Sequence, residues 1–402
     1  MKPEITDIKY LDDNPMYGID YDWDKVCRLY NSLGVPDGVY NPTAVHQIQS
    51  GKIIVDMSER NTGKSTNWML FMLCVYKLYG SETAYVRELV DMLMPKHSME
   101  IFKTILNPNY DYLNKLFDGR WNTIRYRSRR YFLANTETGE EDDRPFMLSV
   151  SVDENGLNKS SLQLPDTDII FFDEFISKYN YANEFVDFMD TVKTIIRERD
   201  APFIVMAANT LDMHSFWFKE LEIYEAIQGM NIDEQKIIKT EGGTTIDVAF
   251  IGASLETMTE HRKRHNAKFF GFKNPKLNAI RGGAWAVKMY PHPDREADTE
   301  TVLRNRYISH NGFLINLELM HNNRHGYHVI VHEANQTYDD SIIYNLDLQP
   351  LNRNYKFKWG TSKVDKLLYK LLQENKFFYA TNFCGTLIED YIRSIKKGDF
   401  LV

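Results

Sequence analysis

The stretch that most constrains the fold runs from residue 52 to residue 66 and reads KIIVDMSERNTGKST. Its short apolar run predicts a buried strand at 53–55, and a long apolar segment follows Gly-Lys-Ser as far as Gly80. A strand, a polar turn, Gly-Lys-Ser and a helix in this order are typical of a phosphate loop, in which backbone N–H groups and the helix N-terminus bind phosphate oxygens. Lys64 would reach the β- and γ-phosphates, and Ser65 would ligate Mg²⁺.

The loop departs from its usual pattern at one position. The pattern G-x-x-x-x-G-K-[ST] begins with glycine, and this chain has Ser58 there. Gly-Lys-Ser alone is common, so an ordinary helix start after a turn is the alternative interpretation. In a phosphate loop, Arg60 would contact the γ-phosphate. The predicted nucleotide-binding residues of the loop are Ser58, Arg60, Thr62, Gly63, Lys64, Ser65 and Thr66.

A second motif, DIIFFDE, occupies residues 168–174. Its four apolar residues predict another buried strand, which ends in Asp173 and Glu174. Asp173 would hold the Mg²⁺ shell, and Glu174 would polarise the attacking water as general base. An acidic pair after a strand can also be a solvated turn or a helix cap. The two motifs lie about 110 residues apart in the expected order, so together they favour a nucleotide site.

A third apolar strand at 203–208 ends at Asn209. Apolar strands with polar ends, separated by helices, predict an α/β domain with a mostly parallel sheet and a ligand site at the strand ends. Asn209 would sense the γ-phosphate or the water, or it only caps the strand. Tyr40, about 20 residues before the loop, would stack on the nucleotide base, unless it packs on the core beside a proline-fixed turn.

Lys159 is a candidate for action on a neighbouring subunit, and two arginines end a predicted helix. Lys159 lies in the loop before the Asp173 strand, although surface lysines are common. Arg197 and Arg199 end a predicted helix at 183–199, where cations also need no functional explanation.

Charge argues against a protein that coats DNA. The net charge is −8, but residues 271–402 hold 18 Lys and Arg against 14 Asp and Glu. Cations that line one channel would still grip DNA. The candidates are a basic cluster at 262–276 and another at 125–130, in which Arg125, Arg127 and Arg129 would share one face of a strand paired with a strand at 146–152. A solvated edge strand is the alternative.

The order of the segments predicts two domains and a linker. Residues 1–250 form the phosphate-loop domain with an N-terminal extension, 251–298 a basic linker or small helical region, and 299–402 a small α+β domain. No apolar run reaches the roughly 18 residues that span a bilayer, and residues 1–10 have no signal-peptide pattern. The three cysteines are far apart, which favours a reducing cytoplasm. We expect no membrane partner.

Several of these motifs together resemble a known family. They are the phosphate loop, DIIFFDEF at 168–175, MDTV at 189–192 leading to RER at 197–199, and Asn209. They resemble the DNA-packaging ATPases (encapsidation proteins) of small tailed phages with protein-primed genomes. Short matches at 40–42, 159–160 and 311–313 add to the resemblance, which is strong at 50–210 and thin beyond 215.

The resemblance implies a fold and a setting. The first domain would be a P-loop ATPase of the additional-strand, catalytic-glutamate (ASCE) type, and the last would be similar to RNase H-type nucleases. Arg197 or Arg199 would be the arginine finger, since the preceding helix is about one residue longer than in the family. The subunits would form a homo-oligomeric ring, usually pentameric, that docks on the portal protein of a procapsid. Some members use a packaging RNA, and the residues do not decide whether this chain does.

The sequence therefore predicts a motor ATPase that uses ATP and Mg²⁺ to drive double-stranded DNA into a viral procapsid in the host cytoplasm. ATP is favoured over GTP because no N-K-x-D guanine signature occurs. The alternatives are a terminase-like ATPase with an active nuclease, a helicase, or a nucleotide-binding structural adaptor without turnover.

We expect the C-terminal domain not to cleave DNA. Two-metal cleavage needs several converging carboxylates, and the predicted strands at 307–332 contain only Glu318, with Glu333 just after them. The alternative is that packing gathers Glu318, Asp347 and Asp390.

Overall fold

The structure is a computed structural model of the chain and forms two compact units. The first comprises residues 1–178, 184–213 and 220–286, and the second comprises residues 179–183, 214–219 and 287–402. None of the helices within the described residues is long and apolar enough to cross a membrane. Most of the predicted linker at 251–298 lies outside the described residues. The described residues are 8–11, 17–36, 39–58, 62–88, 99–152, 167–176, 184–209, 215–231, 233–251, 290–293, 297–310, 312–346, 355–356 and 362–397.

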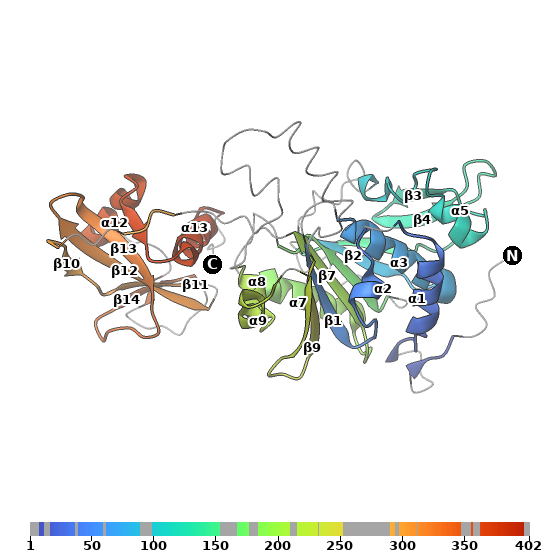
Figure 1. The fold of residues 1–402 in the computed structure, drawn as a ribbon, viewed down its shortest axis with the longest axis horizontal. Coiled ribbons are helices and arrows are strands. Elements are labelled where there is room, and N and C mark those ends of the chain that lie inside the picture. Colours follow the sequence, from blue (N-terminus) through green and yellow to red (C-terminus); the bar gives the residue numbers. More distant parts are fainter. Residues whose placement is uncertain are drawn as a thin grey trace. The chain divides into compact units, whose positions relative to one another are not determined.

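The first unit is built on a large sheet with the strand order β3-β4-β5-β2-β6-β7-β1-β9-β8 (Figure 1). In this order, the strands from β5 across to β9 are parallel to their neighbours. Strands β3, β4 and β8 pair antiparallel at the two edges of the sheet. The predicted mostly parallel α/β sheet is confirmed. The strands are β1 (Lys52–Ser58), β2 (Thr83–Arg87), β3 (Thr123–Arg127), β4 (Arg130–Ala134), β5 (Met147–Ser151), β6 (Ile169–Asp173), β7 (Phe203–Asn209), β8 (Glu234–Lys239) and β9 (Thr245–Ile251).

Strand β7 lies between β1 and β6 and pairs parallel with both. Ser58 at the end of β1 lies opposite Asn209, and Asp173 at the end of β6 lies opposite Ala207. Parallel strands end at the same edge of a sheet, so the polar ends of both sequence motifs meet there. One strand therefore lies between the two strands that carry the motifs.

Helix α3 (Lys64–Tyr79) covers one face of this sheet. Most of its 16 residues are buried, as expected for a helix that is apolar all round. It shares a core with alternate strand residues such as Ile54 and Phe171. Its other sides are packed by α1 (Trp23–Ser32), α2 (Pro42–Val45), η4 (Glu100–Phe102) and α5 (Tyr112–Phe117) (Figure 1).

Helix α7 (Glu184–Ile196) covers the opposite face. Successive strand residues point to opposite faces, and Phe172 of β6 packs on Phe188 of α7 with 4.8 Å between ring centroids. The first unit is therefore a sheet between two helical layers. The short helix α9 (Tyr224–Gln228) also belongs to this unit, whereas residues 216–219 of α8 (Phe216–Glu220) belong to the second unit.

The arginine-rich hairpin differs from the prediction. Arg125 and Arg127 lie on β3, but Arg129 lies in a tight turn with a φ of 65°. The partner of β3 is β4, and the strand predicted as its partner is β5, one place further into the sheet. The prediction missed this turn because the run of arginines contains neither glycine nor asparagine to mark it.

The described residues of the second unit form a mixed sheet with two longer helices, and most of α8 also belongs to this unit. Strands β11, β12 and β13 pair antiparallel, β14 pairs parallel with β11, β15 with β14, and β16 with β13. This agrees with the predicted α+β character and with the strands predicted within residues 307–332. The elements are β10 (Glu300–Leu303), β11 (Arg306–His310), β12 (Phe313–Asn322), β13 (Gly326–Glu333), β14 (Ile342–Asn345), β15 (Tyr355–Lys356), β16 (Phe377–Tyr379), α12 (Lys363–Gln373) and α13 (Asn382–Lys397).

Candidate functional site

A pocket of about 390 Å³ opens where β1, β6 and β7 end and α3 begins. The sequence predicted most of its lining. The residues around it are Thr62, Gly63, Lys64, Ser65, Thr66, Asp173, Glu174, Ala207, Ala208 and Asn209. The two motifs and Asn209 thus surround one space, although they lie far apart along the chain.

Gly63 allows the loop to turn into α3. Its φ is 89°, in the left-handed region that only glycine adopts readily. A Cβ atom at this position would lie 2.7 Å from Cγ1 of Val39, so a side chain is excluded by packing as well. The helix therefore begins at Lys64 with its N-terminal N–H groups at the pocket, where they and the helix dipole favour an anion.

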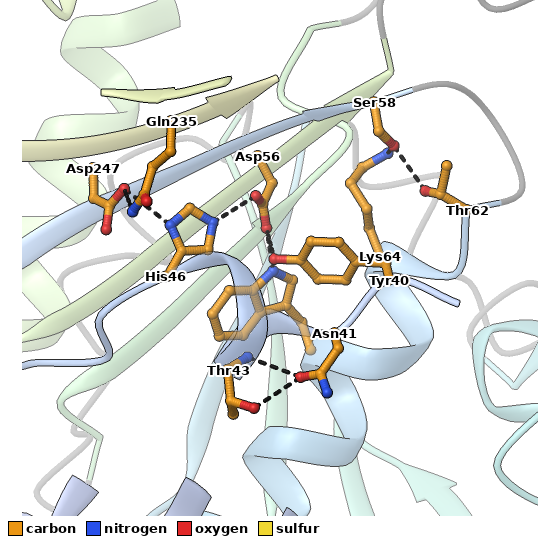
Figure 2. A network of polar contacts seen from close by, with 11 residues as sticks. Tyr40, Asn41, Thr43, His46, Asp56, Ser58, Thr62, Lys64, Gln235 and Asp247 are labelled. Carbon is orange, nitrogen blue, oxygen red and sulfur yellow. Dashed lines mark hydrogen bonds and ion pairs between the residues drawn. The ribbon is translucent and has the colours of Figure 1, made fainter. Parts of the chain in front are cut away.

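Lys64 is held by the residue that replaces the first loop glycine. Its Nζ donates a hydrogen bond to Oγ of Ser58, and that oxygen lies 2.7 Å from Oγ1 of Thr62 (Figure 2). Ser58 is fully buried and does not line the pocket. The serine therefore leaves the pocket open and gives the Lys64 ammonium a hydroxyl acceptor.

Ser65 and Asp173 have the geometry of a shared magnesium site. Oγ of Ser65 donates to Oδ1 of Asp173 at 2.7 Å, so two hard oxygen ligands converge at the pocket. Mg²⁺ in nucleotide sites uses one or two protein ligands together with phosphates and water. The described residues contain no group of three or more His, Cys, Asp or Glu able to hold a metal alone. These residues fit Mg²⁺.

Glu174 stands at the rim of the pocket in an unusual backbone conformation. Its φ is 57° and its side chain is about half exposed. A non-glycine residue in the left-handed region costs energy and is found preferentially at functional sites. The exposed carboxylate next to a phosphate-sized space suits a base that acts on water.

The sequence analysis missed Arg87, which ends β2 beside β6. Its Nη1 donates to Oδ2 of Asp173 at 3.1 Å and its Nη2 to Oε2 of Glu174 at 2.7 Å. The hydroxyl of Tyr85 also donates to Oδ2 of Asp173, at 3.1 Å. The sequence signal was a charged residue at the end of a predicted apolar strand, but only the sheet order shows which acids it meets.

Tyr40 is in the core, so the prediction that it stacks on a base is wrong. Its ring is 4% exposed and packs near Trp68. Its hydroxyl donates to Oδ2 of Asp56 (Figure 2). The structure agrees with the alternative interpretation of Tyr40, in which it packs on the core beside a turn fixed by Pro42.

Arg197 and Arg199 lie at the opposite end of the parallel strands, near the start of β6. Nη1 of Arg199 donates to the backbone oxygens of Ile195 and Thr167, and Thr167 precedes β6. Five residue steps at roughly 3.3 Å separate Asp168 from Asp173, or about 16 Å. The structure does not bring these arginines to the pocket of their own chain. Arg197 is exposed, whereas Arg199 is partly buried.

Other predicted residues have different outcomes. Arg60, Lys159 and the basic cluster at 262–276 lie outside the described residues. In the cluster at 125–130, Arg125 and Arg127 both pair with Glu141, at 3.3 and 2.8 Å. Part of the positive charge that was predicted to bind DNA is thus balanced by a glutamate of the same chain.

Solved structures with the same fold are known. The chain is similar to the Phi-28 gp11 DNA packaging motor, with a TM-score of 0.55 and 17% identity over 90% of this chain and 99% of that chain. It is also similar to a chain of the bacteriophage Phi-29 viral genome packaging motor assembly, with a TM-score of 0.54 and 17% identity over 89% and 99% of the two chains. No family model and no curated protein matches the chain. At this identity the likeness establishes the fold.

The position of Arg87 generates a prediction about magnesium. In Arg87→Met, the nearly buried carboxylate of Asp173 and that of Glu174 lose their cation, so the nucleotide-free protein should melt a few degrees lower, for a loss of about 1–2 kcal/mol. Millimolar Mg²⁺ should then raise the melting temperature of Arg87→Met more than that of the wild type, because the ion no longer competes with the guanidinium. Thermal unfolding with MgCl₂ or EDTA measures both effects.

The matched control is Arg125→Met, which removes an arginine–glutamate pair elsewhere in the same unit. It should respond to Mg²⁺ as the wild type does. Equal Mg²⁺ shifts in all three proteins would show that Arg87 does not occupy a cation site.

Proposed function

We propose that this protein is a viral DNA-packaging ATPase that couples ATP hydrolysis to translocation of double-stranded DNA into a procapsid. The observation that carries the proposal is the meeting of the phosphate loop, Asp173, Glu174 and Asn209 around one pocket. This pocket lies in a chain whose fold is that of two packaging-motor proteins. The partners in this proposal are DNA, the portal protein and further copies of the chain in a ring of five, in the host cytoplasm.

In the proposed reaction, the N–H groups at the start of α3 and the ammonium of Lys64 bind the β- and γ-phosphates. Ser65 and Asp173 would hold Mg²⁺, which would supply positive charge to the phosphate oxygens when bound. Glu174 accepts a proton from the attacking water, and Asn209 orients that water or the γ-phosphate.

The second candidate among enzymes is a terminase-like ATPase with an active nuclease, or a helicase. The nuclease alternative is kept because the mixed sheet of the second unit is compatible with the proposed RNase H-type fold. The non-hydrolysing adaptor is the third candidate. Phosphate release in the presence of DNA, combined with procapsid filling, separates the motor from the helicase and the adaptor.

The first prediction separates binding from turnover. Lys64→Ala should lose ATP binding, because the only cation described inside the pocket is removed. Glu174→Gln should bind Mg-ATP and hydrolyse it at least about 100-fold more slowly, since an amide cannot accept the proton. Binding of a fluorescent ATP analogue and phosphate release measure the two steps. Wild-type hydrolysis by Glu174→Gln would remove the assigned base.

The second prediction concerns the arginine finger. We favour Arg197 over Arg199, because Arg197 is exposed whereas Arg199 is partly buried. Arg197→Ala should reduce hydrolysis by roughly 10³-fold or more. Mixing it with Glu174→Gln should restore part of the activity, because an intact arginine then faces an intact pocket. Failure to rescue at every mixing ratio would place the arginine in a role within its own subunit.

The third prediction is that the second unit does not cut DNA. Glu318, its main candidate acid, accepts a hydrogen bond from Oγ1 of Thr301 at 2.9 Å and lies 3.5 Å from Nε2 of His332. The described residues of the unit gather no acidic cluster able to hold a metal, and Asp347 lies outside them. Supercoiled plasmid with Mg²⁺ or Mn²⁺ should stay intact. Nicking that disappears in Glu318→Ala would favour the terminase alternative.

A further inference from the structure

A short segment lies against the phosphate loop and contacts it directly. We call residues 39–46, which include α2, the strap. The backbone N–H of Tyr40 donates to the carbonyl of Thr62 at 3.0 Å. The side chain of Val39 fills the space beside Gly63, where a Cβ would lie 2.7 Å from its Cγ1. The strap therefore touches the two loop residues that precede Lys64.

The two ends of the strap are anchored to one buried carboxylate (Figure 2). Asp56 on β1 is fully buried. Its Oδ2 accepts hydrogen bonds from the hydroxyl of Tyr40 and, at 2.6 Å, from Nε1 of Trp68 on α3. Its Oδ1 lies 2.8 Å from Nε2 of His46. One carboxylate on the loop's own strand thus holds both ends of the strap and the helix that follows the loop.

His46 also bridges to the neighbouring strand. Its Nδ1 lies 3.0 Å from Oδ1 of Asp247 on β9, an ion-pair contact outside good hydrogen-bond alignment. Nε2 of Gln235 on β8 donates to the same oxygen at 2.7 Å. The side chains of His46, Asp56 and Asp247 are all fully buried, and Figure 2 shows the imidazole between the two carboxylates.

The charges of this cluster fix the position of the strap. Burial alone lowers the pKa of His46, but the carboxylates of Asp56 and Asp247 raise it to about 9. Burial raises the pKa of Asp56, and its contacts with His46, Tyr40 and Trp68 bring it below the usual range. Removing one member of a buried ion cluster leaves an unpaired charge and is strongly unfavourable. An apolar core at this place would pack without such a directional constraint.

We infer that His46 and Asp56 are positioning residues for the phosphate loop. The imidazolium holds the strap between β1 and β9. Tyr40 and Val39 of the strap then set the position of Thr62 and Gly63. The role rests on the proposed function, because it is the nucleotide that the loop would receive. Neither residue lines the pocket, and sequence motifs give no signal for either.

The test compares two tyrosines. Tyr40→Phe removes the strap's hydroxyl contact with Asp56. Its control, Tyr21→Phe, removes an equally buried hydroxyl from Asp168, at the opposite edge of the same sheet. Amide hydrogen exchange reports on the loop without any nucleotide. Exchange at residues 62–65 should become about 5- to 10-fold faster in Tyr40→Phe, as expected for the loss of one hydrogen bond, and stay unchanged in Tyr21→Phe. Unchanged exchange in Tyr40→Phe would overturn the inference.

ATP affinity separates failure of this inference from failure of the proposed function. The Kd of a fluorescent ATP analogue should rise about tenfold in Tyr40→Phe and in His46→Gln, and change less than twofold in Tyr21→Phe. If Lys64→Ala binds the analogue as the wild type does, the proposed function fails. If Lys64→Ala loses binding but both strap variants keep wild-type affinity, only the positioning role fails.

A pH series tests the charge on His46. The groups that face it are Asp56 from β1, Asp247 from β9 and Tyr40 of the strap, with the uncharged Trp68 and Gln235 behind them. A folded-state pKa of about 9, above the unfolded value of 6.5, stabilises the protein fully below pH 6.5 and loses that effect as pH rises through 9. The melting-temperature gap between wild type and His46→Gln should therefore narrow from pH 6.5 to pH 9.5. A constant gap would show that His46 is not a charged clamp.

Discussion

The parallel pairing of β7 with both β1 and β6 is the constraint on which the candidate site depends. It places Ser58 beside Asn209 and Asp173 beside Ala207. Side chains alternate between faces along a strand, so a shift of one residue in either pairing would turn Asp173 away from α3 and Ser65. The central strands are buried almost throughout, so a slip would carry the buried carboxylates of Asp56 and Asp173 away from their partners. The position of the chemistry thus depends on the polar residues as well as on the apolar ones.

The polar residues at these strand ends pair with one another. Lys64 donates to Ser58, Ser65 donates to Asp173, and Arg87 bridges Asp173 and Glu174. In the proposed function, a nucleotide with Mg²⁺ would offer further partners to these groups.

The sequence predicted the parts of this arrangement that are local. Gly63, Lys64 and Ser65 form a contiguous motif, and Asp173 and Glu174 end an apolar run, so strand ends and parallel topology together predicted one site. The parts that depend on long-range pairing were not predictable. Arg87 meets Asp173 only because β2 is the neighbour of β6, and His46 meets Asp56 and Asp247 from strands about 190 residues apart. Tyr40 was misassigned because an aromatic residue near a loop looks the same in sequence whether it faces a ligand or the core.

In the proposed ATPase, the two ends of the parallel strands in the first unit have different roles. The pocket lies at the edge where the parallel strands end, whereas Arg197 and Arg199 lie at the edge where β6 begins. If Arg197 acts on a nucleotide, that nucleotide must be bound by another copy of the chain, because the length of β6 separates the arginine from its own pocket. The contact then joins two different surfaces, one on each copy. Contacts of this kind either close into a ring or continue as an open filament. In the proposed function, the separation of Glu174 and Arg197 at opposite ends of the parallel strands would therefore make assembly a condition of turnover, and a closed ring would be the form in which every pocket receives an arginine.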